Sequence, residues 1–142
     1  MTKVWLLLAA AALTLPNAHA AAAKERKAAV APKPIEVKRS LFSGSESRLF
    51  DFGWLRPDCT SPGADVRIVK PPSKGGIRLE EARTVVTGDK SAVQKLCHGK
   101  ALDSVRLFYK ANDNYSGKDT FLLDVDTKLG YVQRYTFTVD VR

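Results

Sequence analysis

Apolar and polar residues alternate with a period of two along most of the chain from residue 47 onward. Successive side chains of a β-strand point to opposite faces, so this alternation is typical of strands that bury one face and expose the other. It recurs in segments that are separated by turns rich in Pro, Gly, Asp and Ser, at 47–54, 65–70, 76–79, 104–110, 119–126 and 131–142. About seven short strands in one domain predict an all-β fold, a small antiparallel β-sandwich.

The alternation also predicts which side chains face the core. In 119–126 it points Phe121, Leu123 and Val125 inward, and Asp124 and Asp126 toward water. The inward residues predicted for the last segment are Tyr131, Tyr135, Phe137, Val139 and Val141. The stretch 80–99 follows the pattern least, although 84–87 is compatible with a further strand and 89–96 with a loop or one helical turn.

The first twenty residues have the features of a secretory signal peptide. Lys3 precedes an apolar run over 4–15 that is too short to span a bilayer, and Pro16 and the small residues Ala18 and Ala20 follow. We expect cleavage after Ala20 or two to three residues later; the alternative is an uncleaved N-terminal anchor. Cleavage predicts a periplasmic or secreted protein without a transmembrane anchor.

Residues 21–46 have the composition of a linker. Between 21 and 40 the chain carries six basic residues, two acidic residues and two prolines, with few large apolar side chains. Such a segment buries too little apolar surface to offset its ordering entropy. We therefore expect a disordered basic tail over 21–46, dispensable for folding, and a folded domain over 47–142.

Two cysteines, Cys59 and Cys97, remain after the signal peptide. In an exported chain an even pair without evident metal partners predicts one disulfide bond, and the alternative is a free thiol. Cys97 precedes His98, the only histidine left after cleavage, but neighbouring residues of an extended chain point apart. No residue pattern of an enzyme or of a zinc site is evident, and we expect a non-enzymatic protein.

The segment 110–121, KANDNYSGKDTF, carries a motif in register with strands on both sides. The motif residues are Tyr109, Asn114, Tyr115, Gly117, Asp119 and Phe121. Residues 64–142 thereby resemble the bacterial immunoglobulin-like, cadherin-like repeats that occur in tandem in large surface adhesins. The resemblance implies an Ig-like (cadherin-like) sandwich and a role at the bacterial envelope. Ala111 stands where that family usually has proline, the cysteine pair is not part of its pattern, and the chain holds a single copy.

The motif has a structural and a calcium interpretation. In the first, Asn114 holds a turn, Gly117 adopts a positive φ, and Asp119 caps a backbone amide at the start of a strand. In the second, oxygen ligands from this region bind calcium, and the candidates are Asp113, Asn114, Asp119, Asp124 and Asp126. Lysines at 110, 118 and 128 place positive charge beside such a site, so we expect the structural interpretation and no cofactor.

The mature chain is basic, with 22 lysines and arginines against 15 acidic residues once Lys3 is removed. Several basic side chains fall on predicted outward faces: Arg67, Arg78, Arg106, Lys110 and Arg134. They are candidates for binding anionic envelope polymers such as lipopolysaccharide, glycan or nucleic acid, or they simply confer solubility. Our leading hypothesis is an exported module that binds or packs against an envelope or surface protein or glycan; anionic-polymer binding and a calcium-binding adhesin domain are the alternatives.

Overall fold

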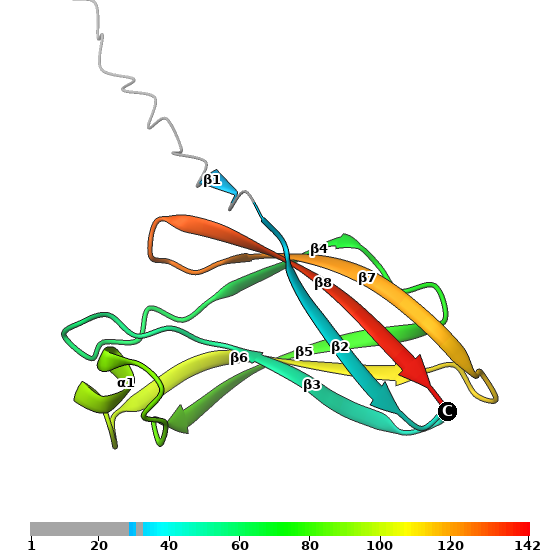
Figure 1. Cartoon of the computed structure of the whole chain (residues 1–142), viewed down its shortest axis with the longest axis horizontal. Helices are drawn as coiled ribbons and strands as arrows, with labels where there is room; N and C mark the ends of the chain where they lie inside the picture. The colour runs from blue at the N-terminus through cyan, green and yellow to red at the C-terminus, as the bar shows by residue number, and fades with distance from the viewer. Residues whose placement is uncertain (1–28, 31–32) are drawn as a thin grey trace, which may run out of the picture.

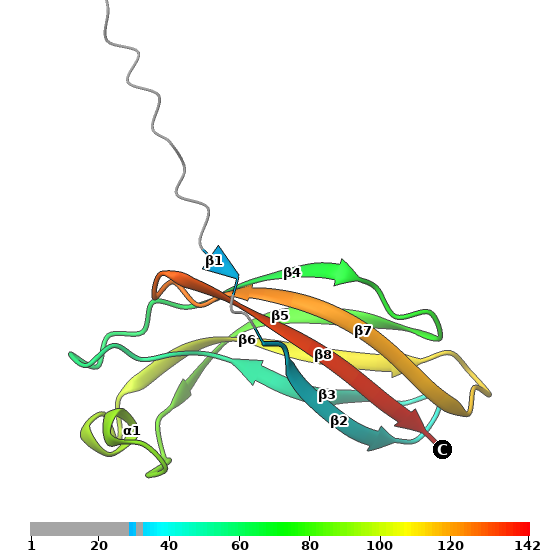
Figure 2. The ribbon, with the colours of Figure 1, turned by 45° about the horizontal axis from the view of Figure 1, so that its top comes forward.

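The computed structural model describes residues 29–30 and 33–142, which form two packed β-sheets (Figures 1 and 2). The first sheet contains β4 (Asp65–Lys70), β7 (Gly117–Asp126) and β8 (Tyr131–Val141) in that order, with β1 (Ala29–Val30) and β2 (Ile35–Leu41) both pairing parallel to β8. The second contains β3 (Glu46–Phe52), β6 (Ala101–Ala111) and β5 (Gly75–Val85). One short helix, α1 (Ala92–Leu96), lies at the end opposite to the C-terminus (Figure 1). The prediction of an all-β sandwich is confirmed.

The core lies between the sheets and is largely aromatic. Phe121 stacks on Tyr109 of the opposite sheet, with ring centroids 5.9 Å apart, and on Phe137 of β8, at 5.0 Å. The fully buried apolar side chains between the sheets include Phe52, Leu107, Tyr109, Phe121, Leu123, Val125, Phe137, Val139 and Val141. Those in 119–126 and 131–142 are among the residues that the alternation points inward, so the period-two pattern identified this part of the core correctly.

The predicted linker over 21–46 is wrong for its C-terminal part, because residues 35–41 form β2. This strand pairs with β8 in continuous parallel register from Ile35 to Leu41. Its inner face buries Val37 and Leu41, which are 6% and 7% exposed, and the side chain of Arg39 between them donates a 3.1 Å hydrogen bond to the carbonyl of Leu49 in the other sheet. Two apolar side chains suffice here because β2 is short and only one of its faces is buried. The signal peptide and most of the remaining tail lie outside the described residues.

At the α1 end of the molecule, the predicted burial of Tyr131 is wrong, whereas one of the two conformations predicted for 89–96 is found. Tyr131, predicted to face the core, is 39% exposed and lies one residue beyond the last pair of β7 with β8, Asp126 and Val132. The irregular stretch 80–99 contains the end of β5 and the single helical turn of α1, one of the two alternatives predicted for 89–96. Within 29–30 and 33–142, no helix has the length and apolarity needed to cross a membrane.

Candidate functional site

The segment 110–121 contains the end of β6, a polar turn over 112–116 and the start of β7. Asn114 and Gly117 have positive φ values of 62° and 128°, a backbone region that asparagine and glycine tolerate better than other residues. Tyr115 donates a 2.8 Å hydrogen bond from its hydroxyl to the carbonyl of Lys118. The expectation that this segment is a turn, with glycine at a positive φ, is confirmed.

Asp119, the first buried residue of β7, connects this turn to a distant one. One carboxylate oxygen accepts hydrogen bonds from the backbone amides of Ser73 and Thr120, and the other from the amide of Lys74 and the hydroxyl of Tyr109, at 2.9–3.1 Å. Burial alone raises the pKa of Asp119, but these donors outweigh it and hold the pKa below its usual value. Asp119 therefore caps backbone amides, as predicted, and joins the β4–β5 turn to the core.

The structure does not bring the five calcium candidates together. Asp113 and Asn114 are exposed in the turn, whereas Asp119 and Asp126 lie near opposite ends of β7, roughly 24 Å apart at the rise of a strand. Asp119 is saturated by hydrogen-bond donors, and Asp124 is paired with arginines. Among the described residues, no group of three or more His, Cys, Asp or Glu side chains is arranged to hold a metal ion.

Asp124 is buried, contrary to the prediction that it points into water. It lies on the outer face of the first sheet, in register with Arg67 of β4 and Arg134 of β8. Arg134 donates to both carboxylate oxygens at 2.7 and 2.8 Å, and Arg67 donates at 2.9 Å. The two arginines leave Asp124 only 2% exposed, and the hydrogen bonds from Arg134, more than the burial that opposes them, lower its pKa.

We expect Asp124→Asn to lower the free energy of unfolding by about 1–3 kcal/mol, because it weakens hydrogen bonds between charged groups at a buried position. The matched control is Asp126→Asn on the same strand and face, which should change stability by less than about 0.5 kcal/mol. Urea unfolding of both variants, with calcium and with chelator, measures this. Equal stability of the two variants, or a calcium-dependent loss in either, would contradict the prediction.

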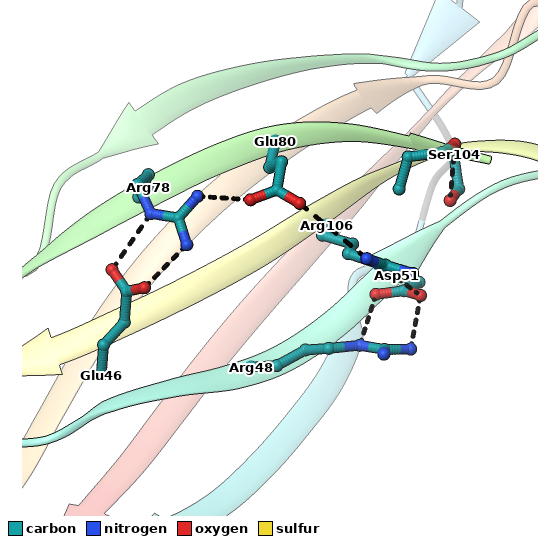
Figure 3. Close-up of polar contacts among 8 residues, drawn as sticks. Glu46, Arg48, Asp51, Arg78, Glu80, Ser104 and Arg106 are labelled. Carbon is teal, nitrogen blue, oxygen red and sulfur yellow. Dashed lines mark hydrogen bonds and ion pairs between the residues drawn. The ribbon is translucent and has the colours of Figure 1, made fainter. Parts of the chain in front are cut away.

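The outer face of the second sheet carries a row of alternating charges that crosses all three strands (Figure 3). Arg78 donates to both oxygens of Glu46, at 2.7 and 3.1 Å, and to Glu80 at 2.7 Å. Arg106 lies 3.8 Å from Glu80 and 3.7 Å from Asp51. Arg48 completes the row with a bidentate ion pair to Asp51. The guanidinium carbon of Arg78 also lies 4.1 Å from the ring centroid of Phe108, a cation–π contact. This row of three arginines and three carboxylates is electrically neutral.

The basic residues predicted to bind anions therefore do not form one patch. Arg67 and Arg134 lie on the first sheet, whereas Arg78, Arg106 and Lys110 lie on the second. All four arginines are engaged with carboxylates of the same chain. The row on the second sheet is neutral, whereas Arg67 and Arg134 share the single carboxylate of Asp124 and keep one net positive charge.

A different basic region lies at the α1 end, in the segment 86–100, which we call the α1 segment. Its two ends are held together by hydrogen bonds of Val86 with Gly99 and Lys100, each 2.9 Å. A disulfide bond joins Cys97, which is fully buried, to Cys59 in the β3–β4 loop, with the Cα atoms 5.3 Å apart. The disulfide predicted from the sequence thus fixes the α1 segment to the body of the domain.

The α1 segment is basic, with three exposed lysines against one acidic residue, Asp89. Lys90, Lys95 and Lys100 are exposed, and among the described residues none of them has a carboxylate within 4.0 Å. Leu96, between them, is 67% exposed. Sequence analysis missed this cluster; the available signal was a lysine at every fifth position around an apolar residue.

No protein-family model matches the chain, and no curated protein matches it.

Proposed function

We propose that this chain is an exported, non-enzymatic, Ig-like module that binds a protein partner of the bacterial envelope through its α1 segment. The signal-peptide pattern of residues 1–20 supports export. The strand order supports the Ig-like class: β3-β6-β5 faces β4-β7-β8, as strands B-E-D face C-F-G in Ig sandwiches, and the first long strand pairs with β8.

The observation that carries the proposal is the contrast between the α1 segment and the arginines on the faces of the sheets. The arginines on the sheet faces are satisfied by carboxylates of the same chain, as in the row that Figure 3 shows. The α1 segment instead combines the exposed Leu96 with three lysines that have no carboxylate partner nearby among the described residues. An exposed apolar side chain on a segment with excess positive charge fits a partner surface with an apolar depression and an acidic rim.

The disulfide bond favours binding without a large ordering cost. It ties Cys97, one residue after Leu96, to the sandwich, so the apolar side chain is presented from a constrained segment. A constrained binding segment loses less conformational entropy on association than a free loop.

Site-specific photo-crosslinking in the native envelope tests the proposal. A photoreactive residue at position 96 should yield a discrete protein adduct, identified by mass spectrometry. The matched control is position 68, where Ile68 is an exposed apolar residue of β4, outside the α1 segment, and is 45% exposed. Adducts of equal yield from both positions, or from position 68 alone, would show that the α1 segment is not the binding surface.

The same lysines also favour the second candidate function, binding of an anionic envelope polymer. Salt separates the two candidates, because polymer binding releases counterions and weakens steeply as the salt concentration rises. A protein interface that buries Leu96 should largely persist, and Leu96→Ser should then weaken binding more than Lys95→Gln. The reverse order, with collapse in salt, assigns the surface to a polymer.

A further inference from the structure

The second sheet ends in β5, the longest outer strand among the described residues. Its 11 residues pair with β6 alone, in continuous register from Gly75 with Ala111 to Val85 with Ala101. The outer strands β3 and β4 each contain a register shift, and two prolines follow β4. β5 contains no register shift, proline or lysine, which are features that usually prevent an edge strand from pairing with another chain.

The hydrogen bonds at the two ends of the β5–β6 ladder show which backbone groups of β5 are free. The carbonyl of Lys74 accepts from the amide of Asn112, and the amide of Val86 donates to the carbonyl of Lys100, both at 2.9 Å. Because bonding alternates along an antiparallel pair, the even-numbered residues of β5 bond to β6, and the odd-numbered residues direct their N–H and C=O groups away from it. No other strand in the described ranges pairs with this edge. β5 therefore offers a regular row of donors and acceptors to an added strand.

The charge and the position of this edge are compatible with a second copy of the chain. The two arginines of β5, Arg78 and Arg83, balance its two glutamates, Glu80 and Glu81, so the strand is neutral although the mature chain is basic. The disulfide bond ties the α1 segment to the β3–β4 loop, and β3 lies on the side of β6 opposite to β5. Two copies that meet along β5 therefore bring no net charge together at this strand.

Two charged side chains of β5 are incompletely paired within one copy. Alternation places Glu81 and Arg83 on the inner face of β5, the face on which Ile77 and Leu79 pack against the core. Both are exposed, and Arg83 contacts only Asp103, at 3.5 Å. Among the described residues, no cation lies within 4.0 Å of the Glu81 carboxylate. Inward charges of this kind oppose strand pairing unless the added strand neutralises them.

A second copy of β5 neutralises them in one register. When two antiparallel copies meet with Ala82 opposite Ala82, Glu81 of each copy lies opposite Arg83 of the other. The same register places Val85, which is 58% exposed, opposite Leu79. These four positions are all odd-numbered, so the free backbone groups of the two strands face each other. Opposite charges and apolar side chains in such cross-strand pairs are stabilising.

The neighbouring registers lack this match. Pairings centred on Glu80 or Glu81 place two glutamates opposite each other, and a pairing centred on Arg83 does the same with two arginines. A pairing centred on Leu79 places Glu81 opposite the apolar Ile77 and leaves its charge without a partner. Of the registers centred on residues 79–83, the one centred on residue 82 alone pairs opposite charges on the inner face.

We propose that β5 pairs antiparallel with β5 of a second copy, with Ala82 at the centre, so that the second sheets of the two copies form one continuous sheet. The free backbone groups supply the hydrogen bonds, the reciprocal Glu81–Arg83 pairs set the register, and Leu79 covers Val85. This inference goes beyond the proposed envelope partner and is tested without one.

Sedimentation equilibrium of the oxidised mature protein, residues 21–142, measures the association. We expect a reversible monomer–dimer equilibrium, which Glu81→Arg and Arg83→Glu should each weaken at least about tenfold, because each brings like charges together. An equimolar mixture of these two variants should dimerise again, since both positions then meet the opposite charge. Lys38→Glu, at an exposed position of β2, is the control for net charge and should leave the association unchanged.

Two results would overturn the proposal. One is a wild-type protein that stays monomeric at millimolar concentration, which includes the case in which β5 pairs with a strand of a different protein. The other is a mixture of the two charge variants that associates no better than either variant alone.

Cysteine substitutions test the register. Ala82→Cys should yield a disulfide-linked dimer under mild oxidation, because opposite residues of a non-hydrogen-bonded antiparallel pair have Cα atoms about 4.5 Å apart, within disulfide reach. Thr84→Cys, on the same face of β5, is the control and should not link, since its two copies would lie roughly 13 Å apart along the strands. Intact mass with and without reductant measures the yield. Equal linkage at both positions, or linkage at position 84 alone, would overturn the assigned register.

Discussion

Removing residues 21–41 should lower the free energy of unfolding by at least about 4 kcal/mol, whereas removing only residues 21–32 should leave it nearly unchanged. The longer deletion eliminates β2, its parallel pairing with β8 and the burial of Val37 and Leu41. A single buried leucine or isoleucine truncated to alanine already costs about 2–5 kcal/mol, and the deletion also exposes one edge of β8. The shorter deletion removes only the two-residue pairing of β1.

Urea and thermal unfolding of the two truncated proteins check this expectation. Substitutions within the full-length strand provide the control, since Val37→Ala and Leu41→Ala should each be destabilising, whereas Glu36→Ala and Lys38→Ala should be nearly neutral at exposed positions. If the protein that starts at Phe42 unfolds at the same temperature as wild type, β2 contributes nothing and the packing described for it is incorrect.

β2 also shows why composition misplaced the start of the domain. Over 21–46 the basic residues and prolines dominate the average, and that average predicts disorder. The strand itself needs only Val37 and Leu41 on one face, because its other face and one edge remain open to solvent. In the longer strands β7 and β8, more apolar positions alternate, and the same reading of the sequence located the core correctly.

Asp124 shows a different limit of the sequence pattern. Alternation correctly places it on the outer face of the sheet, but an outward residue is not necessarily solvated. Its exposure depends on Arg67 and Arg134, which are 57 and 10 residues away in the chain and become neighbours only through strand register. Register across three strands is a tertiary property that local periodicity does not specify. The pairing of the outward arginines with carboxylates depends on register in the same way.

The α1 segment was the least predictable part because no periodic pattern runs through it. Its conformation is determined by the disulfide bond, the Ser91 cap and close contacts at Gly88, rather than by an apolar stripe. The sequence predicted the cysteine pair but not which surface the bond would organise. The proposed binding surface lies there, at a position where loops carry function on a rigid scaffold.

The second large effect is expected at Asp119, where Asp119→Asn should lower the free energy of unfolding by about 2–4 kcal/mol at neutral pH. The carboxylate accepts from two amides of the β4–β5 turn, from Tyr109 and from its own neighbour Thr120. An asparagine has the same size but places an NH₂ group against donors, which leaves buried polar groups unsatisfied. Asp113→Asn, an exposed position of the same turn region, is the control and should be nearly neutral.

The pH dependence separates this explanation from a loss of packing. The donors lower the pKa of Asp119 in the folded protein despite its burial, so its carboxylate favours folding fully above the unfolded pKa of about 3.9. That contribution is lost as the pH falls through the lower, folded-state pKa. The stability difference between wild type and Asp119→Asn should therefore be full at pH 7 and shrink below about pH 4, as measured by urea unfolding across this range. Tyr109→Phe removes one donor and should cost about 1 kcal/mol in the wild type but less in a chain that already carries Asp119→Asn. A difference that stays constant with pH would mean that Asp119 stabilises the fold through its shape rather than through its charge.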